Sequence, residues 1–258
     1  MIVNEVIVKK IWNAAIEYLN LRVSQEDLNL HLRPPQLEKA NSFEKIYFRL
    51  VASSKNRNMM AKVIGDTRKY ELVLCRFQPD AVLSKYKNDW ELLAKNLFVA
   101  RHGHIDDEYL SRKGNLFNVF AKSCISAGEY LDGFDSPEQF VKSIDSEIKN
   151  SGNLVKVPKR ISSEIYGFGF ALACDFLKEC GWTQFPKPDV HLNKVFHNFG
   201  LSSKKDVEVF GAIQEFSKIV DKTPYEVDKV FWLIGSGRLH LVGQSFKTSI
   251  EEFEKASA

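Results

Sequence analysis

Residues 161–200 read ISSEIYGFGFALACDFLKECGWTQFPKPDVHLNKVFHNFG, and this stretch decides the fold that the sequence predicts. Apolar residues at helical spacing predict a short helix around Ser162–Ile165 and a second helix that stops at Gly181. Gly167 and Gly169 lie between these helices, where glycine lets the backbone turn tightly and approach another surface closely. The stretch therefore predicts two helices joined by a hairpin turn.

Helical patterns recur along the rest of the chain, which has only 14 glycines and 8 prolines in 258 residues. Ser136-Pro137-Glu138 and Thr223-Pro224-Tyr225-Glu226 each place a cap residue, a proline and an acid where a helix begins. Short strands are expected at most in the first few residues and around Leu72 to Phe77. The expected fold class is mostly α. The apolar stripes are Val8, Ile11, Trp12, Ala15, Ile16 and Leu19; Phe43, Ile46, Tyr47 and Leu50; Phe117, Phe120, Ala121, Cys124 and Leu131; Phe140, Val141, Ile144 and Ile148; and Val227, Val230, Phe231 and Ile234.

Proline and glycine divide the chain into parts. Pro34-Pro35 interrupts helix and predicts an N-terminal helical segment, residues 1–41, separate from a body of residues 42–258 whose hairpin spans 161–181. A second break is expected at Asn150–Arg160. The tail after Leu241 predicts a single amphipathic helix.

The composition is that of an ordinary globular protein, with 44% apolar and 27% charged residues. No apolar run approaches the roughly 20 residues that span a bilayer, and the first residues lack a signal-peptide pattern, so a cytoplasmic protein without membrane contact is expected. The four cysteines include no C-x-x-C pair, which disfavours a disulfide framework, a zinc site and an iron–sulfur cluster. They are Cys75, Cys124, Cys174 and Cys180.

The net charge of +3 is small, but the positive charge is concentrated in two islands. Residues 45–69 hold seven Lys or Arg against the single acid Asp66, and residues 151–205 hold eight against four. Two such islands indicate a localised anionic partner, whereas lysines on solvated helix faces are the simpler interpretation of either island alone.

The turn with Gly167 and Gly169 is suited to bind a phosphate. Backbone amides at these glycines and at the start of the next helix would point outward, toward an anion at the positive end of the helix. Such contacts position DNA without reading its sequence. A G-x-G alone is more often an ordinary turn between helices.

With Asp189 the chain resembles the helix-hairpin-helix–Gly/Pro–Asp superfamily of DNA base-excision glycosylases. The similarity lies in residues 165–173, IYGFGFALA, followed at the family's interval by Pro188-Asp189-Val190-His191. Looser similarity runs from about Phe43 to Gly237. The resemblance implies two helical subdomains with a DNA-binding cleft between them. It also implies hairpin contacts to DNA through Gly167, Phe168, Gly169 and Ala171.

The resemblance assigns catalysis to Asp189. Breaking an N-glycosidic bond builds positive charge on the sugar, which a carboxylate stabilises while it orients or deprotonates the attacking water. The alternative is that Asp189 only caps the next helix, and the two roles are compatible. His191 is expected to pack, and Lys194 is expected to meet a phosphate.

Members of the family that also cleave the strand carry a nucleophilic lysine shortly after the hairpin. At that interval this chain has Ala171, and the nearest lysine on the helix, Lys178, is expected to face solvent. The sequence therefore predicts a monofunctional enzyme without lyase activity. No cofactor or metal is required, although the resemblance leaves room for a monovalent cation at the hairpin.

Residues 53–65, SSKNRNMMAKVIG, resemble a polar turn in the 8-oxoguanine branch of the family, whose amide side chains fill the gap left by an extruded base. By this analogy Asn56, Arg57 or Asn58 would be the wedge. The alternative is a polar helix start with Met59, Met60 and Val63 packed inward.

Three functions remain in competition. The first is a monomeric DNA glycosylase that flips a damaged or modified base from double-stranded DNA, in base excision repair or against modified phage DNA. It would leave an abasic site for a downstream AP endonuclease. The second is a helix-hairpin-helix DNA-binding protein without chemistry, and the third is a helical protein-interaction module.

Overall fold

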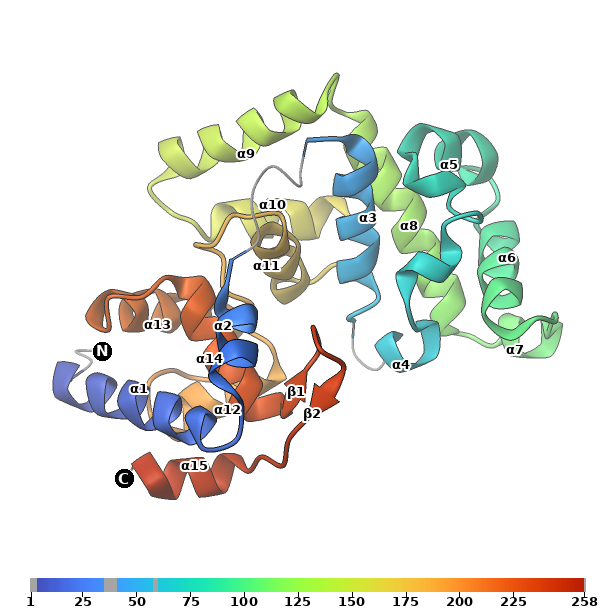
Figure 1. The fold of residues 1–258 in the computed structure, drawn as a ribbon. Helices are drawn as coiled ribbons and strands as arrows, with labels where there is room; N and C mark the ends of the chain where they lie inside the picture. The colour runs from blue at the N-terminus through green and yellow to red at the C-terminus, as the bar shows by residue number, and fades with distance from the viewer. Residues whose placement is uncertain (1–3, 35–40, 58–59, 258) are drawn as a thin grey trace. The chain divides into compact units, whose positions relative to one another are not determined.

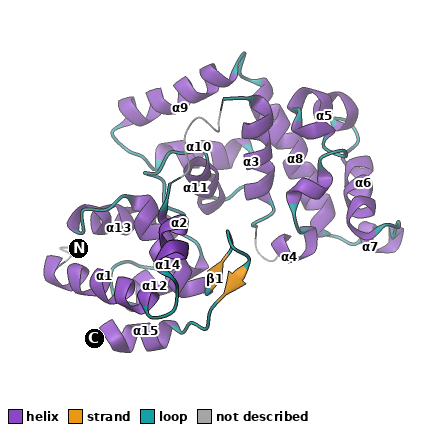
Figure 2. Cartoon of the chain, viewed as in Figure 1, coloured by secondary structure: helices purple, strands orange, loops and turns teal. Residues whose placement is uncertain are grey.

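The computed structural model describes residues 4–34, 41–57 and 60–257, and most of these residues are helical (Figure 1). In the described ranges, strands are limited to one antiparallel pair, β1 (Arg238–Leu239) and β2 (Gln244–Ser245), shown in orange in Figure 2. The predicted mostly-α class is confirmed.

The chain divides into two compact units, and each is described by itself. The terminal unit comprises residues 1–35 and 181–258, and the central unit comprises residues 36–180. Helices of residues 4–34, which belong to the predicted N-terminal segment 1–41, pack with helices of the C-terminal part of the chain.

The terminal unit is built around α14 (Pro224–Ser236), which packs against the other helices of this unit. Val8, Ile11 and Leu19 of α1 join Val230, Phe231 and Ile234 of α14 in one hydrophobic core. These are the residues of the two apolar stripes, so hydrophobic periodicity identified the core of this unit correctly. The other helices are α1 (Glu5–Asn20), α2 (Gln25–Leu32), α12 (Val190–Asn198), α13 (Asp206–Ile219) and α15 (Ile250–Ser257).

The tail after Leu241 is not the single helix that was predicted. It forms β2 and only then α15, because β2 pairs with β1 directly after α14. Gly237 ends α14 at a φ of +64°, and a Cβ atom there would lie 2.6 Å from the carbonyl oxygen of Phe246. This close approach lets the tail fold back along the end of α14.

The central unit is built around α8 (Leu116–Asp132), which Figure 1 shows between α3 on one side and α5 and α6 on the other. Tyr47 of α3 donates its hydroxyl to the carbonyl of Cys124 at 3.0 Å inside this core. The other elements are α3 (Phe43–Ser54), α4 (Met60–Ile64), η2 (Thr67–Tyr70), η3 (Cys75–Phe77), α5 (Pro79–Tyr86), α6 (Trp90–His102), α7 (Asp107–Ser111), α9 (Pro137–Ser151), α10 (Lys156–Glu164) and α11 (Phe170–Glu179).

The prediction of a short strand around Leu72 to Phe77 is wrong. Cys75, Arg76 and Phe77 all have positive φ, and the segment satisfies its amides locally, for example from Arg76 N–H to the carbonyl of Glu71 at 2.7 Å. Local turns thus use the donors that a strand would offer to a partner. Residues 1–3, where the other strand was expected, lie outside the described residues.

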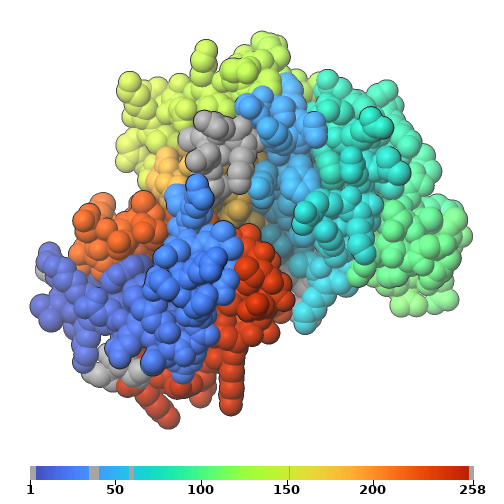
Figure 3. Space-filling view, viewed as in Figure 1, coloured from blue at the N-terminus to red at the C-terminus, as the bar shows by residue number. Residues whose placement is uncertain are grey.

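The surface of the central unit includes α7, none of whose residues is buried; it lies at the green edge of this unit in Figure 3. In the described ranges, no helix combines the length and the hydropathy that crossing a membrane requires.

The start of α14 provides a test of this packing. Thr223 Oγ1 accepts the N–H of Glu226 at 3.2 Å, and the Glu226 carboxylate accepts the N–H of Thr223 at 2.8 Å. We expect Thr223→Ala to lower the free energy of unfolding by about 1 kcal/mol, because this reciprocal cap is lost. Urea denaturation followed by tryptophan fluorescence measures it, since three of the four tryptophans lie in the terminal unit. Thr223→Ser keeps the hydroxyl and should change little; an equal loss in both variants would contradict the role of the cap.

Candidate nucleic-acid interface

Helices α10 and α11 pack against each other in the central unit and are joined by residues 165–169. The first helix begins at Lys156, earlier than the predicted start near Ser162. The break in helical structure that was expected over Asn150–Arg160 therefore ends before Lys156. Pro158 does not prevent this because it lies in the first helical turn, where its missing N–H would have no partner within the helix. The second helix ends at Glu179, just before Gly181, as predicted.

The turn between the two helices is fastened to α8 by two serine hydroxyls. Ser123 Oγ donates to the carbonyl of Tyr166 at 2.9 Å, and Ser126 Oγ accepts the N–H of Tyr166 at 2.9 Å. Both backbone polar groups of Tyr166 are thus satisfied by one neighbouring helix. The backbone of the turn is thus attached to α8, while the Tyr166 side chain is 48% exposed.

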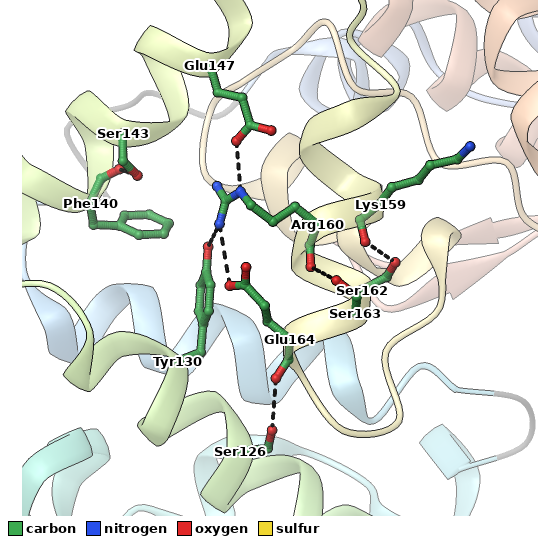
Figure 4. A network of polar contacts seen from close by, with 10 residues as sticks. All are labelled: Ser126, Tyr130, Phe140, Ser143, Glu147, Lys159, Arg160, Ser162, Ser163 and Glu164. Atoms are coloured by element: carbon green, nitrogen blue, oxygen red, sulfur yellow. Dashed lines mark hydrogen bonds and ion pairs between the residues drawn. The ribbon is translucent and has the colours of Figure 1, made fainter. Parts of the chain in front are cut away.

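The first hairpin helix is fixed by Arg160, which contacts three elements (Figure 4). Its guanidinium donates from Nε to Glu147 of α9 at 2.8 Å and from Nη1 to the Tyr130 hydroxyl of α8 at 3.3 Å. It also pairs with Glu164, one turn on, at 3.5 Å. Burial raises the pKa of Tyr130 to about 12, so its hydroxyl stays protonated and accepts this hydrogen bond. The network ties α8, α9 and α10 together beside the turn.

Three backbone amides of the turn make no hydrogen bond to any described residue: those of Gly167, Gly169 and Ala171. Gly169 is exposed, and a Cβ atom built on it would meet nothing within 4 Å. By contrast, Phe168 is 7% exposed and donates its N–H to Ile165 at 3.1 Å. Open donors at the start of a helix favour an anion such as a phosphate.

The structure brings the predicted wedge turn to this hairpin. A Cβ atom on Gly167 would lie 3.0 Å from Arg57 Nη1 and 2.8 Å from Ser123 Oγ, and Gly167 has a φ of +78°. Glycine is therefore favoured here by the positive φ and by the close approach of Ser123 Oγ, with the Arg57 guanidinium also nearby. The Arg57 guanidinium has no hydrogen bond or ion pair with the described residues, so its charge is available beside the open amides.

The three candidate wedge residues have different surroundings. Asn56 is exposed but donates from Nδ2 to Asp175 Oδ2 at 3.3 Å, whereas Arg57 is half-buried against Gly167. Asn58 lies outside the described residues, as does Met59 of the alternative interpretation. Arg57 is thus the described member of the trio that carries a positive charge.

The basic island that contains Arg57 is partly used within its own fold. Lys55 Nζ donates to the carbonyl of Gly65 at 3.2 Å, and burial lowers the pKa of Lys55. Arg68 pairs with Asp66 at 3.4 Å, while Lys62 is exposed. The net charge of this island therefore overstates the charge that a partner would meet.

Asp189 belongs to the terminal unit and caps α12. Its Oδ1 accepts the N–H groups of His191 at 2.9 Å and Leu192 at 3.3 Å, while Oδ2 makes no hydrogen bond to the described residues. His191 packs as expected: a Cβ atom on Gly235 would lie 2.6 Å from its Cβ. Lys194 is exposed on α12, where a phosphate contact stays a prediction.

The prediction that Lys178 faces solvent is wrong. Lys178 is 3% exposed, because α11 is enclosed on every side from Leu172 to Lys178 and has no solvent face there. Ala171, at the family's lysine interval, is half-buried in the first turn of α11. Neither position offers an exposed amine.

Three residues that organise this site were missed by sequence reasoning: Ser123, Ser126 and Asp175. Asp175 left a signal, since it is a single carboxylate within an otherwise apolar run, ALACDFL. The two serines gave a weaker signal in the sequence, because polar residues at these positions of α8 are compatible with a solvated face.

Among the described residues, no group of three or more His, Cys, Asp or Glu is placed to hold a metal ion.

Comparisons with known proteins add no assignment: the chain matches no protein-family model, no curated protein and no solved structure at a significant level.

The two hairpin glycines make opposite predictions for stability. We expect Gly167→Ala to lower the free energy of unfolding of the central unit by about 1–3 kcal/mol, because φ is positive and the Cβ meets Ser123 and Arg57. Gly169→Ala is the matched control and should change it little, since its φ is −104° and the space is open. Thermal melting monitored by circular dichroism compares the two. Equal effects would show that the close approach at Gly167 does not matter.

Proposed function

We propose that this protein is a monofunctional DNA glycosylase that extrudes a damaged or modified base and hydrolyses its N-glycosidic bond. The observation that carries the proposal is the group of open donors on the hairpin: three unpaired amides beside the unpaired guanidinium of Arg57. Phosphate oxygens are the acceptors that such a combination favours.

The hairpin supports binding to DNA in general, without selection of sequence. Amide donors contact phosphates, which every sequence carries, and the turn is held rigidly by Ser123 and Ser126. The exposed Gly169 leaves room for a phosphate to approach the backbone. The DNA-binding cleft that the family resemblance implies stays part of this proposal.

Asp189 supports the chemical step because its two carboxylate oxygens are used unequally. Oδ1 is occupied by the α12 cap, which fixes the orientation of the side chain, and Oδ2 is left for a water or a sugar. A fixed carboxylate stabilises the oxocarbenium-like transition state and can take the proton of the attacking water. The alanine at position 171 favours water over an amine as the nucleophile.

The second candidate is a DNA-binding protein without chemistry. The observation that favours it is the cap itself, because an N-terminal cap accounts for Asp189 without any reaction. Both candidates require the hairpin, so only a measurement of base release separates them.

Asp189→Asn tests the catalytic assignment. The wild-type protein is incubated with a panel of duplexes that carry damaged or phage-modified bases, and released bases are identified by mass spectrometry. Asparagine retains the cap oxygen but lacks the charge, so we expect base release to fall by about 10²–10³-fold with unchanged or higher DNA affinity. Asp221→Asn is the control, since it removes the same charge at an exposed position of the terminal unit.

Each outcome of that assay has a consequence. Near wild-type release by Asp189→Asn would overturn the role of Asp189, and no release from any duplex by the wild type would favour the non-catalytic candidate. Strands should stay intact until alkali or an AP endonuclease is added, and borohydride should trap no adduct. Efficient trapping would show that a lysine elsewhere is the nucleophile.

Gly169→Val tests the hairpin contact. Its extended backbone accepts valine, and a Cβ atom there meets nothing in the described structure, so the fold should persist. We expect the larger side chain to block the phosphate and weaken binding of all duplexes alike, by about tenfold, with a shallower salt dependence. Fluorescence anisotropy at several salt concentrations measures this. Unchanged affinity would count against the hairpin as the DNA contact and favour the protein-interaction module.

A further inference from the structure

Asp175 is a carboxylate in the interior of the central unit. It lies on α11, the second helix of the hairpin, and is 7% exposed. Burial of a carboxylate costs free energy unless hydrogen bonds compensate, so the groups that donate to Asp175 help to stabilise it in the interior. Two of them come from the segment at the end of α3 rather than from the hairpin.

Asp175 Oδ2 accepts two hydrogen bonds from that segment. Ser53 Oγ, in the last turn of α3, donates at 3.1 Å, and Asn56 Nδ2, in the turn that follows, donates at 3.3 Å. Hydrogen bonds to an ionised carboxylate are stronger than those between neutral groups. The carboxylate therefore joins the turn after α3 to the hairpin helix.

The same turn places Arg57. Asn56 N–H donates to the carbonyl of Ser53 at 3.0 Å, and Arg57 N–H donates to that of Ser54 at 3.2 Å, so the backbone from Ser53 to Arg57 is tightly wound. A residue directly after Asn56 in such a turn has little freedom once the Asn56 side chain is held. The Arg57 guanidinium lies against Gly167, where Nη1 would be 3.0 Å from a Cβ atom.

We propose that Asp175 is a positioning residue for DNA binding, which acts through Asn56 to hold the guanidinium of Arg57 against the hairpin turn. This inference rests on the proposed function. It assigns a role to the one carboxylate of α11 that lies within its buried stretch, and it predicts that loss of this negative charge weakens the binding of a negatively charged ligand.

The direction in which DNA affinity changes distinguishes a positioning role of Asp175 from a general effect of its charge. Removal of any negative charge would by itself strengthen DNA binding, because the protein becomes more positive. Asp132→Asn is the matched control: it removes one charge from an exposed position of the central unit, at the end of α8. Positioning predicts the opposite change for Asp175→Asn.

The experiment is a double-mutant cycle with a short fluorescein-labelled DNA duplex, read by anisotropy at low ionic strength. We expect Asp175→Asn to weaken binding about fivefold and Arg57→Ala about tenfold, because a charge-assisted phosphate contact is displaced or lost. In the Arg57→Ala background, Asp175→Asn should cause no further loss. Asp132→Asn should bind as the wild type or more tightly. Circular dichroism confirms that each variant is folded.

Two results would overturn the inference while the proposed function stands: wild-type or tighter binding by Asp175→Asn, or a loss that persists undiminished without Arg57. If Asp175→Asn fails to fold, Asn56→Ala replaces it, since Asn56 is exposed and Ser53 still contacts the carboxylate. The same cycle then applies, and a loss that persists without Arg57 again contradicts the inference. A wild-type protein that binds no duplex overturns the proposed function itself.

Discussion

The pair of hydrogen bonds from Ser123 and Ser126 to the backbone of Tyr166 is the contact on which the candidate interface depends. A turn between two helices exposes polar groups at its surface, and a flexible turn would present them in many orientations. Ser123 and Ser126 of α8 satisfy both polar groups of Tyr166, while the amides of Gly167, Gly169 and Ala171 make no hydrogen bond to the described residues. Gly167 lies so close to Ser123 that a Cβ atom would be 2.8 Å from its Oγ, and Arg57 Nη1 would be at 3.0 Å. The open donors follow from this attachment.

The burial of α11 determines the surroundings of its polar residues. A helix without a solvent face must bury whatever polar residues it carries, and α11 carries Asp175 and Lys178. A buried carboxylate needs hydrogen bonds to offset its desolvation, and Ser53 and Asn56 supply two of them. The core of the central unit and the position of Arg57 at the surface are in this way parts of one arrangement.

Asp189 caps α12, and the chemical role proposed for it would use the same side chain. The cap at α12 holds the carboxylate in one orientation, and a fixed orientation is also what transition-state stabilisation requires. The cap therefore does not argue against catalysis. An asparagine at this position would keep the oxygen that caps the helix and would remove only the charge.

Local patterns in the sequence correctly predicted the caps at Ser136 and Thr223 and the core stripes of α1, α8 and α14. They also located the turn between α10 and α11, because turns depend on neighbouring residues, and Asp189 is the cap that the alternative interpretation gave. The strand expected near Leu72, the solvent-facing Lys178 and the single C-terminal helix were wrong, because each depends on what packs against the segment. Only the tertiary structure brought Arg57 to Gly167 and Asn56 to Asp175, since these pairs are more than a hundred residues apart in the chain. No local pattern encodes such a contact: it arises when α3, α8 and α11 bury their apolar faces together.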